Sequence, residues 1–214
     1  MARPRGFDRE SALQKAMEVF WARGYAATST DDLLNAMGIA RQSLYNAFVD
    51  KRRLYLEAIA AYAARTTSAH LKRLNDPLSP AHGISELLSG LVVDDDAQRA
   101  MGCLGVSSVG EFGVTDPELA ALRATGAPII FARLVERLRE GQEKGEIDPG
   151  MDLESAAAFI QMTMNGLQVA ARGGASAADL RRMAHFAADR ITTRKSKTGD
   201  TDGNQKQLTL TTNV

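Results

Sequence analysis

The sequence predicts an all-α protein. Apolar residues recur mostly at helical spacing, and strand-like alternation is almost absent before the last few residues. Aromatic residues are few, at 6%, while 44% of the 214 residues are hydrophobic. That is enough for one large helical domain, or for a small module joined to a larger one.

Short helices open the chain. The first, over residues 9–23, carries one apolar stripe and ends at Gly24. Thr30 is expected to cap the second, which ends at Gly38 and has Asp31 and Asp32 in its first turn. A third helix is predicted over residues 41–48, and a longer one over residues 51–74.

The rest of the chain predicts longer helices, around residues 84–93, 106–112, 117–144, 153–172 and 177–194. Pro128 lies inside the third of these, so a kink or break is expected there. We place a domain boundary between residues 55 and 56, where the unit of short helices, residues 1–55, gives way to the longer helices of residues 56–194. The polar end, residues 195–214, is predicted to be a disordered tail.

Charge and cysteine content narrow the function classes. Lys plus Arg equals Asp plus Glu at 26 each, so nucleic-acid binding requires a local basic patch. Cys103 is the only cysteine, and the three histidines are far apart, so neither a disulfide nor a metal site is expected. No apolar run has the length of a membrane span or a signal peptide. We therefore expect a cytoplasmic protein with no membrane partner, no metal and no cofactor.

Two short helices joined at a glycine have the geometry of a helix-turn-helix, whose second helix enters the DNA major groove. Gly38 tolerates the positive φ of the turn, and Leu44 and Phe48 are expected to be buried. The remaining side chains suit base edges or phosphates. Arg3 and Arg5 in the N-terminal arm are expected to add phosphate or minor-groove contacts. The predicted DNA contacts are Thr30, Arg41, Gln42, Ser43, Tyr45, Asn46 and Lys51.

The run TSTDDLLNAMGIARQSLYNAFVDKRRLYLEAI resembles the DNA-binding domain of the TetR family of bacterial transcriptional regulators. Thr30, Gly38, Tyr45, Phe48 and Lys51 stand where that pattern places them, and the match covers about residues 9 to 60. The resemblance implies a homodimer, formed largely by the last two long helices, that binds a palindromic DNA operator. It also implies a ligand-responsive repressor with a small-molecule effector pocket among its middle helices. On that basis residues 1–55 are expected to be the DNA-binding domain and residues 56–194 the effector-binding and dimerisation domain.

Two positions depart from the family pattern. Met37 replaces a small alanine before the turn glycine, and Arg52-Arg53 replaces a common acidic residue after the lysine. Neither change breaks the geometry. The second is expected to make the DNA face more positive.

The effector pocket is predicted from apolar and polarizable residues in the second domain. The candidates are Met101, Cys103, Phe112, Phe131, Met162 and Asn165. Each has a plainer interpretation as a core residue. Two other functions stay open at this point: a small all-α enzyme, for which no catalytic residues are found, and a helical scaffold for protein partners, which predicts no DNA binding.

Overall fold

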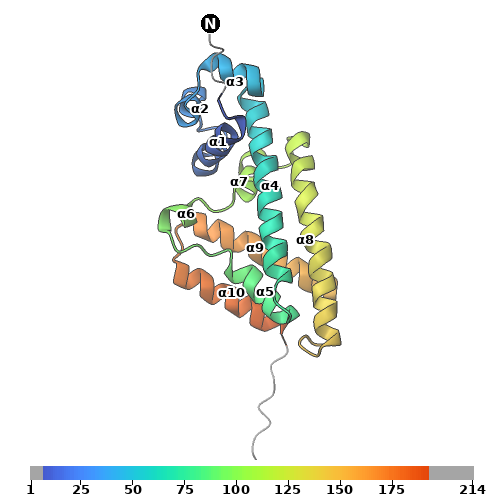
Figure 1. The fold of residues 1–214 in the computed structure, drawn as a ribbon. Helices are drawn as coiled ribbons and strands as arrows, with labels where there is room; N and C mark the ends of the chain where they lie inside the picture. Colours follow the sequence, from blue (N-terminus) through green and yellow to red (C-terminus); the bar gives the residue numbers. More distant parts are fainter. Residues whose placement is uncertain (1–6, 193–214) are drawn as a thin grey trace, which may run out of the picture.

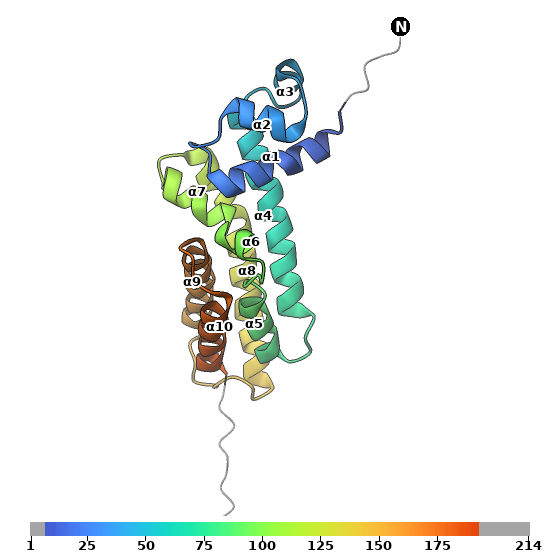
Figure 2. The same ribbon diagram turned by 90° about the vertical axis from the view of Figure 1, so that its left-hand side faces the viewer.

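The computed structural model describes residues 7–192, and every regular element within them is a helix, which confirms the all-α prediction. Figure 1 shows α1–α3 at one end and a long α4 that runs from them into the rest of the molecule beside α8. Figure 2 shows α9 and α10 side by side at one edge. The helices are α1 (Arg9–Arg23), α2 (Thr30–Met37), α3 (Arg41–Phe48), α4 (Lys51–Asn75), α5 (Pro80–Ser89), α6 (Asp96–Ala100), α7 (Leu104–Phe112), α8 (Pro117–Glu143), α9 (Leu153–Arg172) and α10 (Ala177–Ile191).

The helix bounds depart from the sequence prediction mainly in the middle of the chain. α5 begins at Pro80, four residues before the predicted start, because proline is well tolerated in the first turn and Ser79 caps it. α6 was not predicted, since five residues are too few to show a periodic pattern. The last helix ends at Ile191 instead of residue 194.

Of the kink or break predicted at Pro128, the break does not occur, because α8 continues through it to Glu143. Proline removes one backbone donor and crowds the preceding turn. The buried residues Ile130, Leu134 and Leu138 hold the following turns against the core. Packing of these residues outweighs the local preference.

Two hydrophobic clusters organise the fold. One packs α1–α3 around the first half of α4 and also takes in Leu104 of α7 and Leu119 of α8. The other packs the second half of α4 with α5, α8, α9 and α10. Residues of α4 belong to both clusters, so a movement of α4 in one cluster changes the packing in the other. The division at residues 55 and 56 falls inside this helix and stays a prediction.

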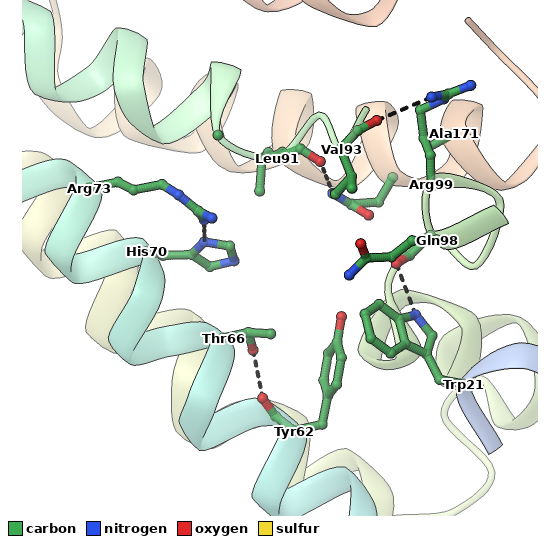
Figure 3. Close-up of a pocket in the computed structure, with 13 residues that line it drawn as sticks. Trp21, Tyr62, Thr66, His70, Arg73, Leu91, Val93, Gln98, Arg99 and Ala171 are labelled. Carbon is green, nitrogen blue, oxygen red and sulfur yellow. Dashed lines mark hydrogen bonds between the residues drawn. The ribbon is translucent and has the colours of Figure 1, made fainter. Parts of the chain in front are cut away.

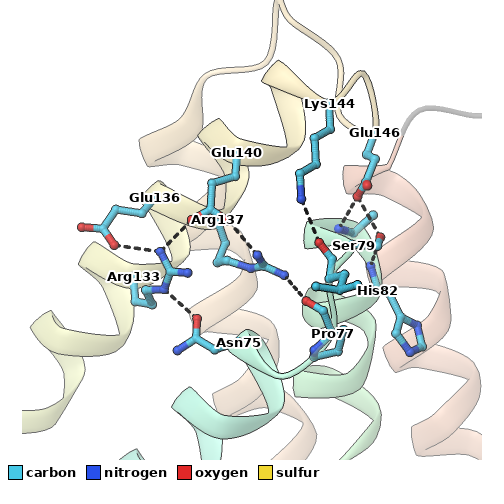
Figure 4. Close-up of polar contacts among 12 residues, drawn as sticks. Asn75, Pro77, Ser79, His82, Arg133, Glu136, Arg137, Glu140, Lys144 and Glu146 are labelled. Carbon is cyan, nitrogen blue, oxygen red and sulfur yellow. Dashed lines mark hydrogen bonds and ion pairs between the residues drawn. The ribbon is translucent and has the colours of Figure 1, made fainter.

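Polar contacts join the far end of α4 to α8 (Figure 4). Arg137 of α8 is 5% exposed and donates to the Pro77 carbonyl at 2.7 Å and to Glu140 at 2.6 Å. Arg133 donates to Asn75 at 2.6 Å. These bonds fix the α4–α5 turn against α8, so the end of the molecule away from α1–α3 is firmly held.

Candidate nucleic-acid interface

α2 and α3 form the predicted helix-turn-helix. Gly38 has φ 68° and ψ 36°, and its N–H donates to the Leu34 carbonyl at 2.9 Å. That left-handed conformation ends α2 and turns the chain toward α3. The capping prediction was wrong by one residue: Ser29, paired with Asp32 in a capping box, is the N-cap, and Thr30 is the first helical residue.

α3 is anchored by its inner face. Leu44 and Phe48 are fully buried, as predicted, and the guanidinium of Arg9 lies 4.5 Å from the centre of the Phe48 ring. Because side chains three and four residues apart share a helix face, burying these two fixes which residues point outward. The outward set contains Arg41, Gln42, Tyr45 and Asn46, while Ser43 is half-buried.

The outward side chains of α3 carry local partners. Arg41 pairs with Asp31 of α2 at 2.5 Å, and Gln42 donates to Asn46 at 2.9 Å. Both contacts are exposed, and exposed pairs of this kind contribute about 0–1 kcal/mol. Exchanging them for base or phosphate contacts therefore costs little. Thr30 lies half-buried at the start of α2, and Arg3 and Arg5 fall outside the described residues.

Lys51 stands at the start of α4, beside the end of α3. Its ammonium lies 4.1 Å from the centre of the Tyr25 ring, a cation–π contact. Partial burial lowers the pKa of Lys51, and the nearby Glu111 carboxylate opposes that shift.

Arg52 and Arg53 do not add positive charge to this face, so that prediction was wrong. Arg52 pairs with Asp116 at 2.6 Å, and Arg53 pairs with Glu118 at 2.6 Å. Both acids lie at the start of α8, more than sixty residues along the chain. The two arginines tie the DNA-binding helices to the rest of the molecule.

Glu111 of α7 makes a second tie, which sequence reasoning missed. Its carboxylate accepts from the backbone N–H of Tyr25 at 2.9 Å and of Ala26 at 3.2 Å, in the turn after α1. Phe112 packs beside it, 5.6 Å from Tyr25 and 5.8 Å from Tyr55 between ring centres. Nothing in the local pattern around Glu111 signals a partner so far away.

The turn between α3 and α4 is strained. Val49 has φ 69° and ψ −59°, and the Asp50 N–H donates to the Phe48 carbonyl at 2.8 Å, which makes a γ-turn. A β-branched residue is unfavourable at positive φ. We expect Val49→Gly to raise the free energy of unfolding by about 1 kcal/mol, since relief of about 1–3 kcal/mol of strain exceeds the entropy that glycine loses.

Urea unfolding of the Val49→Gly variant checks this prediction. Val114→Gly is the matched control, because Val114 is also exposed but does not have a positive φ. The control is expected to lose stability slightly. A Val49→Gly variant that loses as much as the control contradicts the strain argument.

Two hollows lie beyond the helix-turn-helix, and the first of them also touches α1. The first has a volume of about 140 Å³ and is bounded by α1, α4, α6, α9 and the segment after α5 (Figure 3). The second, about 390 Å³, is a more open depression beside Pro128, Phe131 and Gln161. Of the six predicted pocket residues, Phe131 lines the second hollow, and neither lining includes the others.

The other five lie elsewhere and stay predictions. Met162 and Asn165 are exposed on α9, and Met101 and Cys103 are half-buried on either side of Gly102. Phe112 belongs to the aromatic group described above. In residues 7–192 there is no group of three or more His, Cys, Asp or Glu side chains that suits a metal ion.

Known proteins match this architecture. A family model described as bacterial regulatory proteins, tetR family, matches residues 12–58, and a tetracyclin repressor-like C-terminal domain model matches residues 90–187. The HTH-type transcriptional regulator YezE of Bacillus subtilis is 32% identical over 174 residues, which cover 80% of this chain and 90% of that protein. The chain belongs to the TetR family. It is a DNA-binding transcriptional regulator of a non-enzymatic family, and the predicted resemblance is confirmed.

Other TetR-type proteins extend the comparison. The HTH-type transcriptional repressor ComR of Escherichia coli K12 is 28% identical over 184 residues, covering 85% of this chain and 88% of ComR. A cysteine mutant of the TetR family regulator CifR, complexed with 26-base-pair double-strand operator DNA, has a TM-score of 0.75 and 32% identity. That match covers 89% of this chain and 100% of CifR. Within the described residues, no helix is long and apolar enough to cross a bilayer.

Proposed function

We propose that this regulator is a ligand-responsive repressor that binds a palindromic operator as a homodimer, with α3 of each protomer in the major groove. The observation that carries the proposal is α3 itself, whose buried face fixes Arg41, Gln42, Tyr45 and Asn46 outward beside Lys51. CifR, which has a similar fold, is seen on operator DNA, and ComR is named as a repressor.

The side chains divide into two proposed roles. Arg41, Gln42 and Asn46 reach base edges, where guanidinium and amide groups discriminate between base pairs. Thr30, Ser43, Tyr45 and Lys51 contact phosphates and fix the register of α3 on the duplex. Lys51 leaves the Tyr25 ring or reaches past it to do so.

The proposed dimer uses the outer face of α9 and α10. Phe159, Met162 and Val169 form one exposed stripe on α9, and Met183 and Phe186 lie exposed on α10. Gly166 lies on the α9 stripe, where an added Cβ meets no atom within 4 Å. Exposed apolar residues on two neighbouring helices, with room for close approach at Gly166, suit a two-fold, four-helix contact.

The ligand response is proposed to act through the spacing of the two α3 helices. A ligand that binds better to a conformation with the wrong spacing releases DNA, limited by its differential affinity for the two states. The ties from Arg52, Arg53 and Glu111 are the contacts that carry such a shift to α1–α4.

Substitutions on the outward face test the DNA-binding roles. Tyr45→Ala and Lys51→Ala are each expected to weaken operator binding by about tenfold, that is by about 1.4 kcal/mol, without unfolding the dimer. Lys51→Ala also removes one phosphate contact, so the slope of log affinity against log salt falls by about one. Mobility-shift titration at several salt concentrations measures both.

The operator for this titration comes from sequencing DNA fragments selected by the purified protein, and the symmetry of those fragments tests the dimer. Arg139→Ala is the control, because Arg139 is exposed on α8, away from α1–α3. If both variants bind as tightly as the control, the assignment of α3 to the major groove is wrong.

A further inference from the structure

The smaller hollow joins the two parts of the molecule. Trp21 comes from α1, Tyr62 and His70 from α4, Gln98 from α6, and Gln168 from α9. Figure 3 shows Tyr62, His70 and Gln98 pointing into one space. A molecule that fills this hollow contacts α1, which packs against the helix-turn-helix, and the second domain at the same time.

The lining of this hollow is positively charged. It contains Arg73 and Arg99 and no aspartate or glutamate. The guanidinium of Arg99 already has protein partners, because it donates to the carbonyls of Val93, Asp94 and Ala175 and to the Asp96 carboxylate. Figure 3 shows its guanidinium directed away from the space.

Arg73 is different. Its guanidinium lies 3.5 Å from Nδ1 of His70, and no carboxylate of residues 7–192 pairs with it. Gly90 lets the arginine stem pass, since an added Cβ there meets Arg73 Nε at 2.4 Å. A guanidinium held at a hollow without a counter-ion favours an anionic ligand.

His70 supplies a hydrogen-bond donor beside that charge. A guanidinium only donates, so the contact with Arg73 requires an unprotonated Nδ1 and places the ring proton on Nε2. Figure 3 shows this second nitrogen facing the hollow. Burial and the Arg73 charge lower the pKa of His70 to about 4, which keeps the ring neutral near pH 7.

The walls of the hollow are aromatic and amide groups. The Trp21 and Tyr62 rings meet edge to face, with centres 5.1 Å apart, and the Trp21 indole N–H donates to the Gly102 carbonyl at 3.0 Å. The Gln98 side chain makes no hydrogen bond within the described chain, so it is free to bond a ligand. At about 140 Å³ the space is smaller than the roughly 300–1,000 Å³ of pockets for drug-sized molecules.

We propose that this hollow binds a small organic carboxylate with an unsaturated or aromatic body. Arg73 and the Nε2–H of His70 hold the carboxylate, and the ring body lies against Trp21 and Tyr62. The inference rests on the proposed ligand response and deepens it by naming the ligand class and Trp21 as the contact with α1.

Trp21 is also placed to pass the binding event on. Arg172 of α9 donates to the Trp21 carbonyl at 3.3 Å and to the Met101 carbonyl at 2.9 Å. A ligand that moves the indole therefore moves the end of α1 against α9 and the segment before α7. α1 packs directly on α2 and α4, so the movement reaches the helix-turn-helix.

The only tryptophan of the chain lines the hollow, so intrinsic fluorescence reports on its occupancy. The probes are benzoate, phenylacetate and cinnamate, each compared with its neutral amide. At least one carboxylate is expected to change the Trp21 emission saturably at micromolar to millimolar concentration, and its amide is expected to bind about tenfold more weakly or worse. The proposal is overturned if no carboxylate saturates, or if amide and carboxylate bind alike.

Substitutions of Arg73 test whether its positive charge binds the carboxylate. Arg73→Met is expected to weaken carboxylate binding by at least about tenfold, whereas Arg73→Lys keeps the charge and recovers part of the affinity. Arg139→Met, an exposed arginine on the same domain, is expected to bind like the parent chain. Equal binding by Arg73→Met and Arg139→Met sinks the proposal.

Operator binding is also measured without ligand, by fluorescence anisotropy of labelled DNA. This measurement distinguishes a failure of the ligand proposal from a failure of the proposed DNA-binding function. Operator binding without any carboxylate binding refutes the ligand class and leaves the regulator standing. Saturable carboxylate binding with unchanged operator affinity supports the ligand class and refutes its role in the response.

Discussion

Replacing Met162 and Phe186 together with glutamate should leave each protomer folded but monomeric, and should weaken operator binding on the order of 10²–10⁴-fold. Met162 is 72% exposed and Phe186 is 54% exposed, so neither supports the core of the protomer. In the proposed dimer both become buried. A carboxylate buried there without a partner opposes association strongly.

The large effect on DNA follows from linking two weak contacts. A monomer has one recognition helix and pays the full entropy of association for each half-site, whereas the dimer binds its second half-site as an intramolecular event. Sedimentation velocity gives the association state, and mobility-shift titration gives the operator affinity. Circular dichroism checks that the helices persist.

Leu78→Glu is the control for added charge on an exposed apolar residue. Leu78 is 91% exposed in the turn between α4 and α5, away from the outer face of α9 and α10. It is expected to leave both the dimer and operator binding unchanged. A double variant that stays dimeric, or a monomer that binds the operator as tightly as the parent chain, refutes the proposed interface.

The helix-turn-helix was predictable from sequence because its determinants are local. Gly38, Leu44 and Phe48 lie within eleven residues, and each acts through its own backbone conformation or helix face. Spacing alone therefore identifies which side chains are buried and which point outward. The assignment of Thr30 as the cap missed by one residue because Ser29 is an equally good N-cap.

The ties between the two parts were not predictable for the opposite reason. Arg52 and Arg53 look like a phosphate-binding cluster with Lys51 until their partners Asp116 and Glu118 are seen in space. The hollow is equally non-local, since Trp21, Gln98 and Gln168 come from three distant elements. The six pocket residues were predicted because their side chains are apolar or polarizable. That property does not identify a hollow, because its walls are formed by the packing of distant helices.

The stability of the protein should fall between pH 7 and pH 5 by about 2 kcal/mol through His70 alone. Its pKa is about 4 in the folded chain, against 6.5 ordinarily, because burial and the Arg73 charge disfavour the imidazolium. Between pH 6.5 and pH 4, His70 is protonated in the unfolded chain but stays neutral in the folded chain. The contribution of His70 to the free energy of unfolding is therefore fully present above about pH 6.5 and is lost as the pH falls toward 4.

Replacing His70 with glutamine isolates this contribution. The amide still accepts from Arg73 but does not titrate, so urea unfolding of His70→Gln is expected to show a flatter loss of stability from pH 7 to pH 5. The carboxylates with lowered pKa values, such as Asp32 and Asp116, lose their contribution only below about pH 4, outside this window. His82→Gln, which replaces an exposed histidine on α5, is the matched control. If His70→Gln and His82→Gln follow the same pH curve, the ring of His70 is not held neutral, and the assignment of its Nδ1 as the acceptor from Arg73 fails with it.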